Sequence, residues 1–388
     1  MTLVDETTIA PPDQAAGRRD AGAVARAGDA AAVPAEAAGD RDRPRALRTR
    51  TFDDRAALYG SMGGSVALVW VVYDRLLGLD GLVGFILISY VVFLAVYAVI
   101  TALSNPRPVV VDRLMASIVF AGGVVVAGAL VSTLVFIFIE AWPAMSHLNF
   151  YTQDMSGVRP TSPLTEGGVL HAVVGTAIQV GIAIIIALPL GIGTAVYMTE
   201  VGGKLANGVR TVVEAMTALP DVLAGLFIYT VLIIGLQWER NGLAVSLALA
   251  TTMTPVIARS AEVVLKVVPG GLREAGWALG ASKWQTVRRI VLPTAKAGLA
   301  TSLILGIARI TGETAPLLIV SGASTYMNTS PTHEPMNSLP LFIFTAVRSG
   351  EPLYIARGYG AAALLIILVV ALFVLTRILA RAQIGTRS

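Results

Sequence analysis

The stretch "REAGWALGASKWQTVRRIVLP", residues 273–293, is a long charged segment in a chain that is otherwise mostly apolar. Connections between helices are usually shorter than this. The pattern predicts two short amphipathic helices separated at Gly280, because glycine permits a sharp turn or a close backbone approach. Ser282 followed by Gln285 predicts a capping box at the start of the second helix. Pro293 is expected to end that helix and to begin a membrane span.

The composition indicates that this segment belongs to a membrane protein. The chain has 388 residues, of which 55% are hydrophobic and 14% are charged, and its mean hydropathy is +0.72. A soluble domain carries roughly a quarter of charged residues. The sequence has no cysteine, which excludes disulfides and thiolate chemistry, and its three histidines are far apart. We therefore expect an all-α polytopic membrane protein without a metal site.

Eight segments are long and apolar enough to cross a bilayer core, which takes about 20 residues as a helix. They are residues 56–73, 81–103, 114–139, 169–198, 215–236, 242–258, 297–320 and 359–379. Residues 1–55 are rich in Ala, Gly, Asp, Arg and Pro, so we expect a disordered tail there. Residues 56–105 are then two accessory transmembrane helices, and residues 110–385 hold the main transmembrane domain.

The basic residues predict the orientation in the cell membrane. The segment 261–296 contains the following basic residues: Lys266, Arg273, Lys283, Arg288, Arg289 and Lys296. By the positive-inside rule, this segment, the loop 199–214 and both termini face the cytoplasm. The segments 140–168 and 321–358 have few basic residues and face outward. The basic cluster "RDRPRALRTR" (41–50) fits a juxtamembrane anchor on the lipid bilayer, so no nucleic acid is expected as a partner.

The loop 261–296 resembles the cytoplasmic EAA loop of type I ABC importer permeases. The matching positions are Glu274, Ala275, Gly280, Ile290, Leu292 and Pro293, while Gly276 stands where the family usually has a second alanine. The resemblance implies a type I ABC importer transmembrane domain of six core helices, with two extra helices at the N-terminal side. It also implies that these residues couple the chain to a separate ATPase. From the residues alone, an amphipathic helix lying on lipid is an alternative.

The chain contains no G-x-x-x-x-G-K-[ST] phosphate loop. We therefore expect a transport subunit that is not an enzyme by itself and that carries no cofactor. The resemblance implies that ATP and Mg are bound by the partner ATPase, so that only the whole complex would be an ABC-type translocase.

The stretch "ARITGETAPLLI", residues 308–319, places two charges in an apolar segment. Arg309 and Glu313 are four residues apart, so on a continuous helix they share a face. A lone charge at membrane depth costs at least ~2.5 kcal/mol, so such a pair faces the bundle or a water path. The residues allow two interpretations: mutual neutralisation in a packing role, or attraction of an anion that crosses the membrane. Gly312 and Pro316 are expected to loosen the helix there.

Three segments narrow the resemblance to the PstA family of phosphate permeases: "GETAPLL" (312–318), "GGVLHAVVGTAIQV" (167–180) and "LPDVLAGLFIY" (219–229). Asp221 stands where serine is usual in that family. We expect Asp221 near the cytoplasmic end of its span, where it either caps a helix after Pro220 or faces the exit of the path. In this interpretation Arg309 and Glu313 line the translocation path.

The PstA resemblance also implies the partners. These are a PstC-like partner permease, two PstB-like ATP-binding subunits, an extracytoplasmic PstS-like phosphate-binding protein and inorganic phosphate itself. Two alternatives stay open: a permease for another oxyanion of the same superfamily, and a secondary carrier that works without an ATPase.

Overall fold

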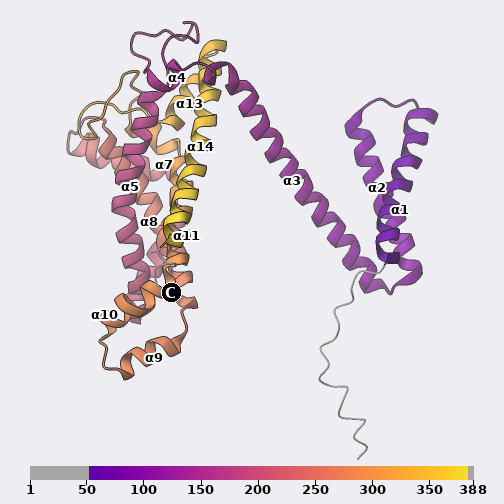
Figure 1. The fold of residues 1–388 in the computed structure, drawn as a ribbon, viewed down its shortest axis with the longest axis horizontal. Coiled ribbons are helices and arrows are strands. Elements are labelled where there is room, and N and C mark those ends of the chain that lie inside the picture. The colour runs from indigo at the N-terminus through magenta and orange to yellow at the C-terminus, as the bar shows by residue number, and fades with distance from the viewer. Residues whose placement is uncertain (1–51, 383–388) are drawn as a thin grey trace, which may run out of the picture. The chain divides into compact units, whose positions relative to one another are not determined.

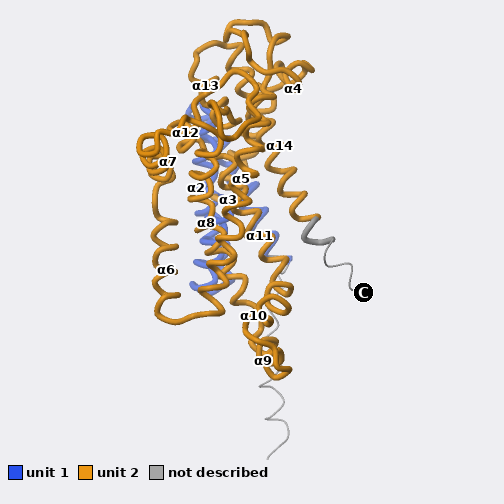
Figure 2. Tube along the Cα trace, turned by 90° about the vertical axis from the view of Figure 1, so that its left-hand side faces the viewer, with its two compact units in different colours: residues 1–121 blue, residues 122–388 orange. Residues whose placement is uncertain are grey.

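The computed structural model describes residues 52–382, and this part of the chain is helical, without a β-strand (Figure 1). The chain forms two compact units, residues 1–121 and 122–388 (Figure 2). Most of the predicted disordered tail, residues 1–51, lies outside the described residues. Its last part, residues 52–55, was predicted wrongly, because it forms the first turn of a helix.

The first unit contains the two predicted accessory spans. Its elements are α1 (Phe52–Trp70), the π-helical segment η1 (Val71–Leu76), α2 (Leu82–Ser104) and the beginning of α3 (Arg107–Met145). Helices α1 and α2 pack along each other. Arg113 of α3 binds Asp54 of α1 at 2.6 Å, and both side chains are largely buried. This ion pair joins the beginnings of α1 and α3.

The second unit contains the remaining helices. They are the rest of α3, α4 (Asn149–Thr152), α5 (Leu170–Val196), η2 (Tyr197–Val201), α6 (Gly203–Ala218), α7 (Asp221–Ile228), η3 (Tyr229–Gly235), α8 (Gly242–Val267), α9 (Gly270–Ala278), α10 (Lys283–Thr286), η4 (Val287–Val291), α11 (Leu292–Thr311), α12 (Ala315–Val320), α13 (Leu339–Val347) and α14 (Pro352–Ala382). Within this unit, α9 and α10 lie at one end, and α4 lies at the other (Figure 1).

The prediction of an all-α polytopic protein is confirmed. Among the described residues, seven helices are long and apolar enough to span a membrane, and the number is eight if α6 and α7–η3 count as one broken span. These two parts are bent by 100° relative to each other. The prediction of a loop at 199–214 was wrong, because α6 begins at Gly203 and η2 ends at Val201. The polar residues of this segment belong to the exposed face of an amphipathic helix, which the sequence pattern did not distinguish from a loop.

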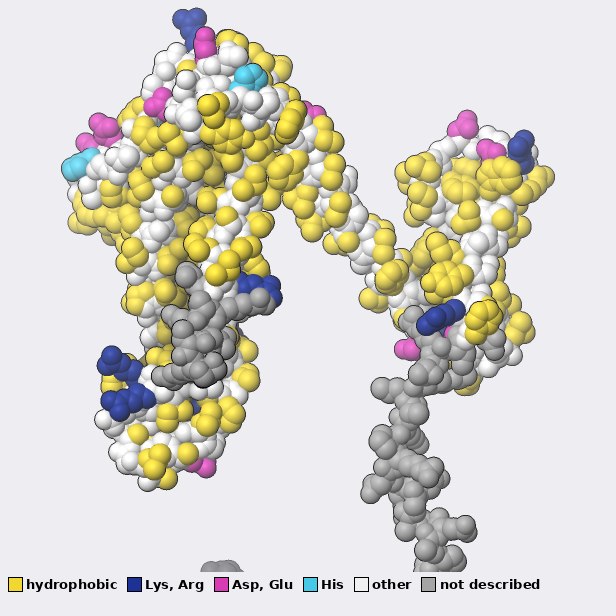
Figure 3. Space-filling model, in the orientation of Figure 1, with side chains coloured by type: hydrophobic (Ala, Val, Ile, Leu, Met, Phe, Trp, Pro, Cys, Tyr) yellow, Lys and Arg dark blue, Asp and Glu magenta, His cyan; other side chains and the backbone are white. Residues whose placement is uncertain are grey.

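Helix α8 is the centre of the second unit and packs against α5 and α11. Small residues make the approach close: a Cβ atom at Gly191 would lie 2.7 Å from the side chain of Ile257. Other helices keep their apolar side chains exposed, as expected for contact with lipid (Figure 3). By contrast, the glycines of "GSMGG" (60–64) have open space beside them, and Ser61 is the buried residue of that stretch.

The predicted span 297–320 was wrong in both its limits and its continuity. The helical segment begins at Lys283, continues through η4 into α11 and ends at Thr311. A separate short helix, α12, follows after a break at residues 312–314. Pro293 therefore does not end a helix. The π-helical segment η4 precedes it and shifts the hydrogen-bond ladder at the point where proline supplies no N–H group.

Candidate functional site

The two charges at the end of α11 meet a third charge from a distant helix. Arg309 Nη2 donates to Asp221 Oδ2 at 2.6 Å, whereas the nearest oxygen of Glu313 is 4.0 Å away. The expected pair of Arg309 and Glu313 is therefore present, but it is the weaker of the two contacts. Asp221 is the residue whose role the sequence did not reveal.

The local backbone explains how Glu313 reaches this position. Helix α11 ends at Thr311 with Gly312 as its C-cap, so Arg309 and Glu313 do not lie on one continuous helix. The N–H of Glu313 still donates to the carbonyl of Ile310, which keeps the turn tight. The expectation that the chain loosens near Gly312 is confirmed by the break before α12.

Asp221 does not act as the helix cap that the sequence suggested. The N-cap of α7 is Pro220, and Asp221 is the first residue of the helix, with its carboxylate turned to Arg309. Asp221 was also predicted to lie at the same end as the loop 261–296, whereas the structure places α7 away from the end that holds α9 and α10 (Figure 2). Helix α6 leads away from the end that holds α9 and α10, and α7 lies beside α12 (Figure 2). The 100° bend after α6 brings Asp221 to Arg309.

The charged side chains of this cluster are partly exposed to solvent. The Arg309 side chain is 42% exposed, and those of Asp221 and Glu313 are 20% and 19% exposed. A guanidinium has five N–H donors, and the bond to Asp221 uses one of them. Arginine binds carboxylates and oxyanions through paired donors on one edge. Chemically, the cluster can bind an anion at the donors that Asp221 leaves available.

The EAA loop at the other end of the unit adopts the structure that its sequence predicts. Helix α9 ends before Gly280, whose φ of +80° is in the left-handed region, so a sharp turn follows there. Ser282 and Gln285 form the expected capping box at the start of α10. Gly276 is buried in α9, and a Cβ atom at this position would lie 2.7 Å from Cδ1 of Ile290. An alanine here would require the Ile290 side chain to move.

The proposed coupling residues divide into two groups. Glu274 and Ala275 are exposed on α9, as is the glycine of the turn. Ile290 and Leu292 are half-buried against the unit, and Pro293 is exposed in the first turn of α11. Large apolar side chains also point outward around the turn, namely Trp277, Leu279 and Trp284, of which Leu279 is 89% exposed. The loop thus presents an unpaired apolar surface.

Arg273 anchors this loop to the transmembrane helices, a role that the sequence does not reveal. Its guanidinium binds the carboxylate of Glu200 through two nitrogens, at 2.8 and 3.2 Å. It also donates to the carbonyls of Leu265 and Val268 at the end of α8. Both partners of the ion pair are largely buried. Consequently, α9 is tied to η2 and to α8 at the same time.

A second charged group lies nearby, around Glu262. Its side chain is 1% exposed, and its carboxylate binds Arg210 and Lys266 at 2.8 Å and Arg259 at 3.2 Å. Arg259 also binds Glu214 of α6 at 3.0 Å. A buried carboxylate requires this kind of pairing. These contacts fasten α6 to α8.

The end of the unit that holds α4 is fastened by hydrogen bonds to backbone groups. Arg357 is 1% exposed and donates to the carbonyls of Ser162, Pro163 and Glu166. In the segment that follows α4, the carboxylate of Asp154 accepts a hydrogen bond from the N–H of Met327. Arg357 thus holds the segment 162–166 against α14, and Asp154 joins the segment around Met327 to the residues that follow α4.

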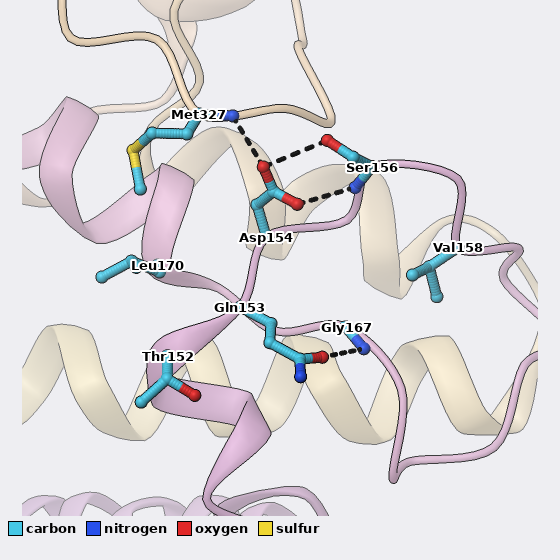
Figure 4. Close-up of a pocket in the computed structure, with 8 residues that line it drawn as sticks. All are labelled: Thr152, Gln153, Asp154, Ser156, Val158, Gly167, Leu170 and Met327. Carbon is cyan, nitrogen blue, oxygen red and sulfur yellow. Dashed lines mark hydrogen bonds between the residues drawn. The ribbon is translucent and has the colours of Figure 1, made fainter.

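Asp154 also borders a cavity of about 400 Å³ at this end (Figure 4). Burial alone would raise the pKa of Asp154, but hydrogen bonds from the N–H of Ser156, the N–H of Met327 and the Ser156 hydroxyl stabilise the carboxylate. The pKa of Asp154 therefore lies below its ordinary value. Since all these donors belong to the chain itself, the carboxylate serves to order the loop.

The loop, the spans and the paired charges together agree with one known family. Residues 187–384 match the model of the binding-protein-dependent transport system inner membrane component. The chain belongs to this family. It is a multi-pass membrane permease with an all-helical transmembrane domain, and it is a transport subunit.

Comparison with individual relatives confirms the expected PstA resemblance. The chain is 39% identical over 251 residues to "Phosphate transport system permease protein PstA 1" of Mycobacterium tuberculosis (strain CDC 1551 / Oshkosh), covering 64% of this chain and 82% of the relative. It is 41% identical over 227 residues to the PstA protein of Mycobacterium leprae (strain TN), covering 58% and 74%. A solved bacterial ABC transporter involved in alginate import aligns with 68% of this chain and 98% of its own, with a TM-score of 0.45 and 18% identity.

Proposed function

We propose that the chain is the permease subunit of an ATP-driven phosphate importer. It forms the translocation path with a PstC-like partner permease and receives phosphate from a PstS-like binding protein outside the cell. The observation that carries the proposal is the similarity to PstA permeases across 251 residues. The residues that match the family model, 187–384, include both the EAA loop and the Arg309 cluster. Phosphate is an anion, and the cluster offers guanidinium donors to an anion.

Coupling to ATP hydrolysis is proposed to take place at the EAA loop. The exposed apolar side chains around Gly280 form a surface that fits a groove on one of two PstB-like subunits. Movement of that subunit would reach the membrane helices through Arg273, which is bound to both η2 and α8. ATP and Mg would be held by the PstB-like subunits, and the whole complex would act as the translocase.

The orientation follows from this assignment, with the EAA loop and both termini in the cytoplasm. The chain has no cysteine, so a single introduced cysteine is a unique reporter. We expect Lys283→Cys to react with a membrane-impermeant maleimide only in inside-out vesicles, and His333→Cys only in intact cells. Both positions are exposed. The reverse pattern of labelling would contradict the orientation.

Uptake by the reconstituted complex tests the function. Vesicles are prepared with this chain, the PstC-like permease, the PstB-like subunits facing the lumen and the PstS-like protein outside. They should accumulate radiolabelled phosphate only when the lumen contains ATP. Unlabelled phosphate should compete, and sulfate and molybdate should not. Preferential uptake of sulfate or molybdate would overturn phosphate as the cargo, and uptake by this subunit alone would overturn the dependence on an ATPase.

A further inference from the structure

The cluster at the end of α11 contains one cation and two carboxylates. If all three groups are charged, the carboxylates outnumber Arg309, although the group is proposed to receive an anion. Asp221, the closer carboxylate, already occupies the guanidinium at 2.6 Å. An incoming anion must therefore share Arg309 with Asp221 or replace it.

The backbone keeps this competitor in place. A Cβ atom at Gly225 would lie 2.6 Å from Cα of Pro316, so α7 and α12 are in direct contact one turn beyond Asp221. The aligned N–H groups at the start of α7 also favour a carboxylate at Asp221. Asp221 is therefore held beside the site by the packing of two helices as well as by its bond to Arg309.

The guanidinium is nevertheless accessible. It is 42% exposed, and its bond to Asp221 leaves four N–H donors for another acceptor. A salt bridge with this degree of exposure is weak enough to exchange, since solvent screens its attraction. A buried pair such as the one formed by Arg273 and Glu200 lacks this access.

We infer that Asp221 is an internal counter-ion that stands in for phosphate at Arg309 while the path is empty and competes with phosphate when it arrives. The inference rests on the proposed function. It makes Asp221 a residue that sets the affinity of the path, because the competing carboxylate lowers the affinity for the anion and assists its release. As phosphate leaves, Asp221 would pair with Arg309 again, so the guanidinium would not remain without a counter-ion.

Phosphate binding to the assembled complex tests this role. The PstS-like protein is omitted, because its own affinity would mask that of the path. Radiolabelled phosphate is titrated against the complex carrying the wild-type chain, Asp221→Asn, Asp221→Glu or Arg309→Gln. Glu239→Gln, at an exposed carboxylate outside the cluster, is the matched control.

We expect Asp221→Asn to bind phosphate about tenfold more tightly than the wild type, since a charge-assisted competitor has been removed. With the binding protein restored, its maximal uptake rate should fall, because release becomes slower. Asp221→Glu should restore wild-type binding. In the Arg309→Gln background, Asp221→Asn should change nothing, since the competition acts through the guanidinium. If Asp221 had only a structural role, its substitution would not strengthen phosphate binding and slow uptake at the same time.

Unchanged or weaker phosphate binding by an assembled Asp221→Asn complex would overturn the inference, as would an equal gain in the Arg309→Gln background. If Asp221→Asn does not assemble, Asp221→Ser provides the same comparison. Uptake of phosphate by the wild type together with no effect at Asp221 refutes this inference alone. Uptake of another oxyanion in place of phosphate refutes the proposed function.

Discussion

The charged groups around Glu262 and around Arg309 differ in how completely their charges are paired. Glu262 is buried and has three cationic partners within 3.2 Å. Arg309 is 42% exposed and is held by one close carboxylate, with Glu313 at 4.0 Å. The first arrangement leaves nothing for a ligand and joins α6 to α8. The second leaves guanidinium donors available to another acceptor, as the proposed translocation path requires.

The difference predicts two kinds of mutational effect. Substitutions in the buried group should reduce stability and the amount of assembled complex. Substitutions in the half-exposed cluster should reduce transport by complexes that assemble normally. The EAA loop adds a third kind, in which transport fails because ATP hydrolysis no longer follows the state of the permease.

The largest effect outside the Arg309 cluster is expected for Gly280→Asp. The φ of +80° costs a non-glycine residue about 1–2 kcal/mol, so the turn should distort and move the apolar side chains of the loop. ATP hydrolysis by the complex should then lose its stimulation by the phosphate-loaded binding protein, and uptake should fall about tenfold or more.

Gly271→Asp is the matched control for this variant. Gly271 is also exposed and has open space around it, but its φ is not positive. It should keep normal stimulation of the ATPase. Normal stimulation in the Gly280→Asp complex as well would show that the loop is not the coupling element.

A smaller effect is expected for Glu262→Gln. The substitution removes the buried negative charge that three cations share, and we expect a loss of about 2 kcal/mol of stability, since the cations reach water. The thermal unfolding midpoint of the complex should fall. Uptake per assembled complex should stay close to that of the wild type. A selective loss of uptake at an unchanged midpoint would erase the distinction between the two groups.

Asp154 provides a pH test at the end of the unit that holds α4. Its pKa is lowered in the folded protein, so its contribution to stability is present above the unfolded pKa near 3.9 and is lost as the pH falls through the folded pKa. Asp154→Asn should reduce the free energy of unfolding at pH 7 by about 1.5 kcal/mol, because its hydrogen bonds lose their charged acceptor, and the unfolding midpoint should fall accordingly. The difference from the wild type should shrink as the pH falls below 4. A difference that grows toward acid would refute this assignment.

The smallest effect on transport is expected when residues 1–105 are removed. The two helices of this segment belong mainly to a unit of their own, whereas the EAA loop and the Arg309 cluster belong to the other unit. Phosphate uptake should remain measurable in cells that lack the segment. Complete loss of uptake at normal membrane levels of the truncated chain would show that these helices are required.

Local features of the fold could be predicted from the sequence, because each depends on a few adjacent residues. The turn at Gly280, the capping box at Ser282 and the break after Gly312 are of this kind. The helix α6 was missed because its polar face resembles a loop. The helix through Pro293 was missed because a π-helical segment has no clear sequence signal.

The partners of the charged side chains could not be predicted, because they are distant in sequence. Asp221 precedes Arg309 by 88 residues. Glu200 precedes Arg273 by 73 residues. The bend after α6 determines the first pairing, and spacing along the chain does not reveal it. The one signal was Asp221 itself, since a carboxylate in an apolar segment requires a partner.

Phosphate uptake by complexes with Arg309→Gln is the most direct test of the account. The substitution removes the charge-assisted donors while keeping a polar side chain of moderate length, so assembly and basal ATP hydrolysis should persist. We predict that uptake per assembled complex falls on the order of 100-fold. Uptake at the wild-type rate by a normally assembled Arg309→Gln complex would contradict the claim that the anion passes beside this cluster.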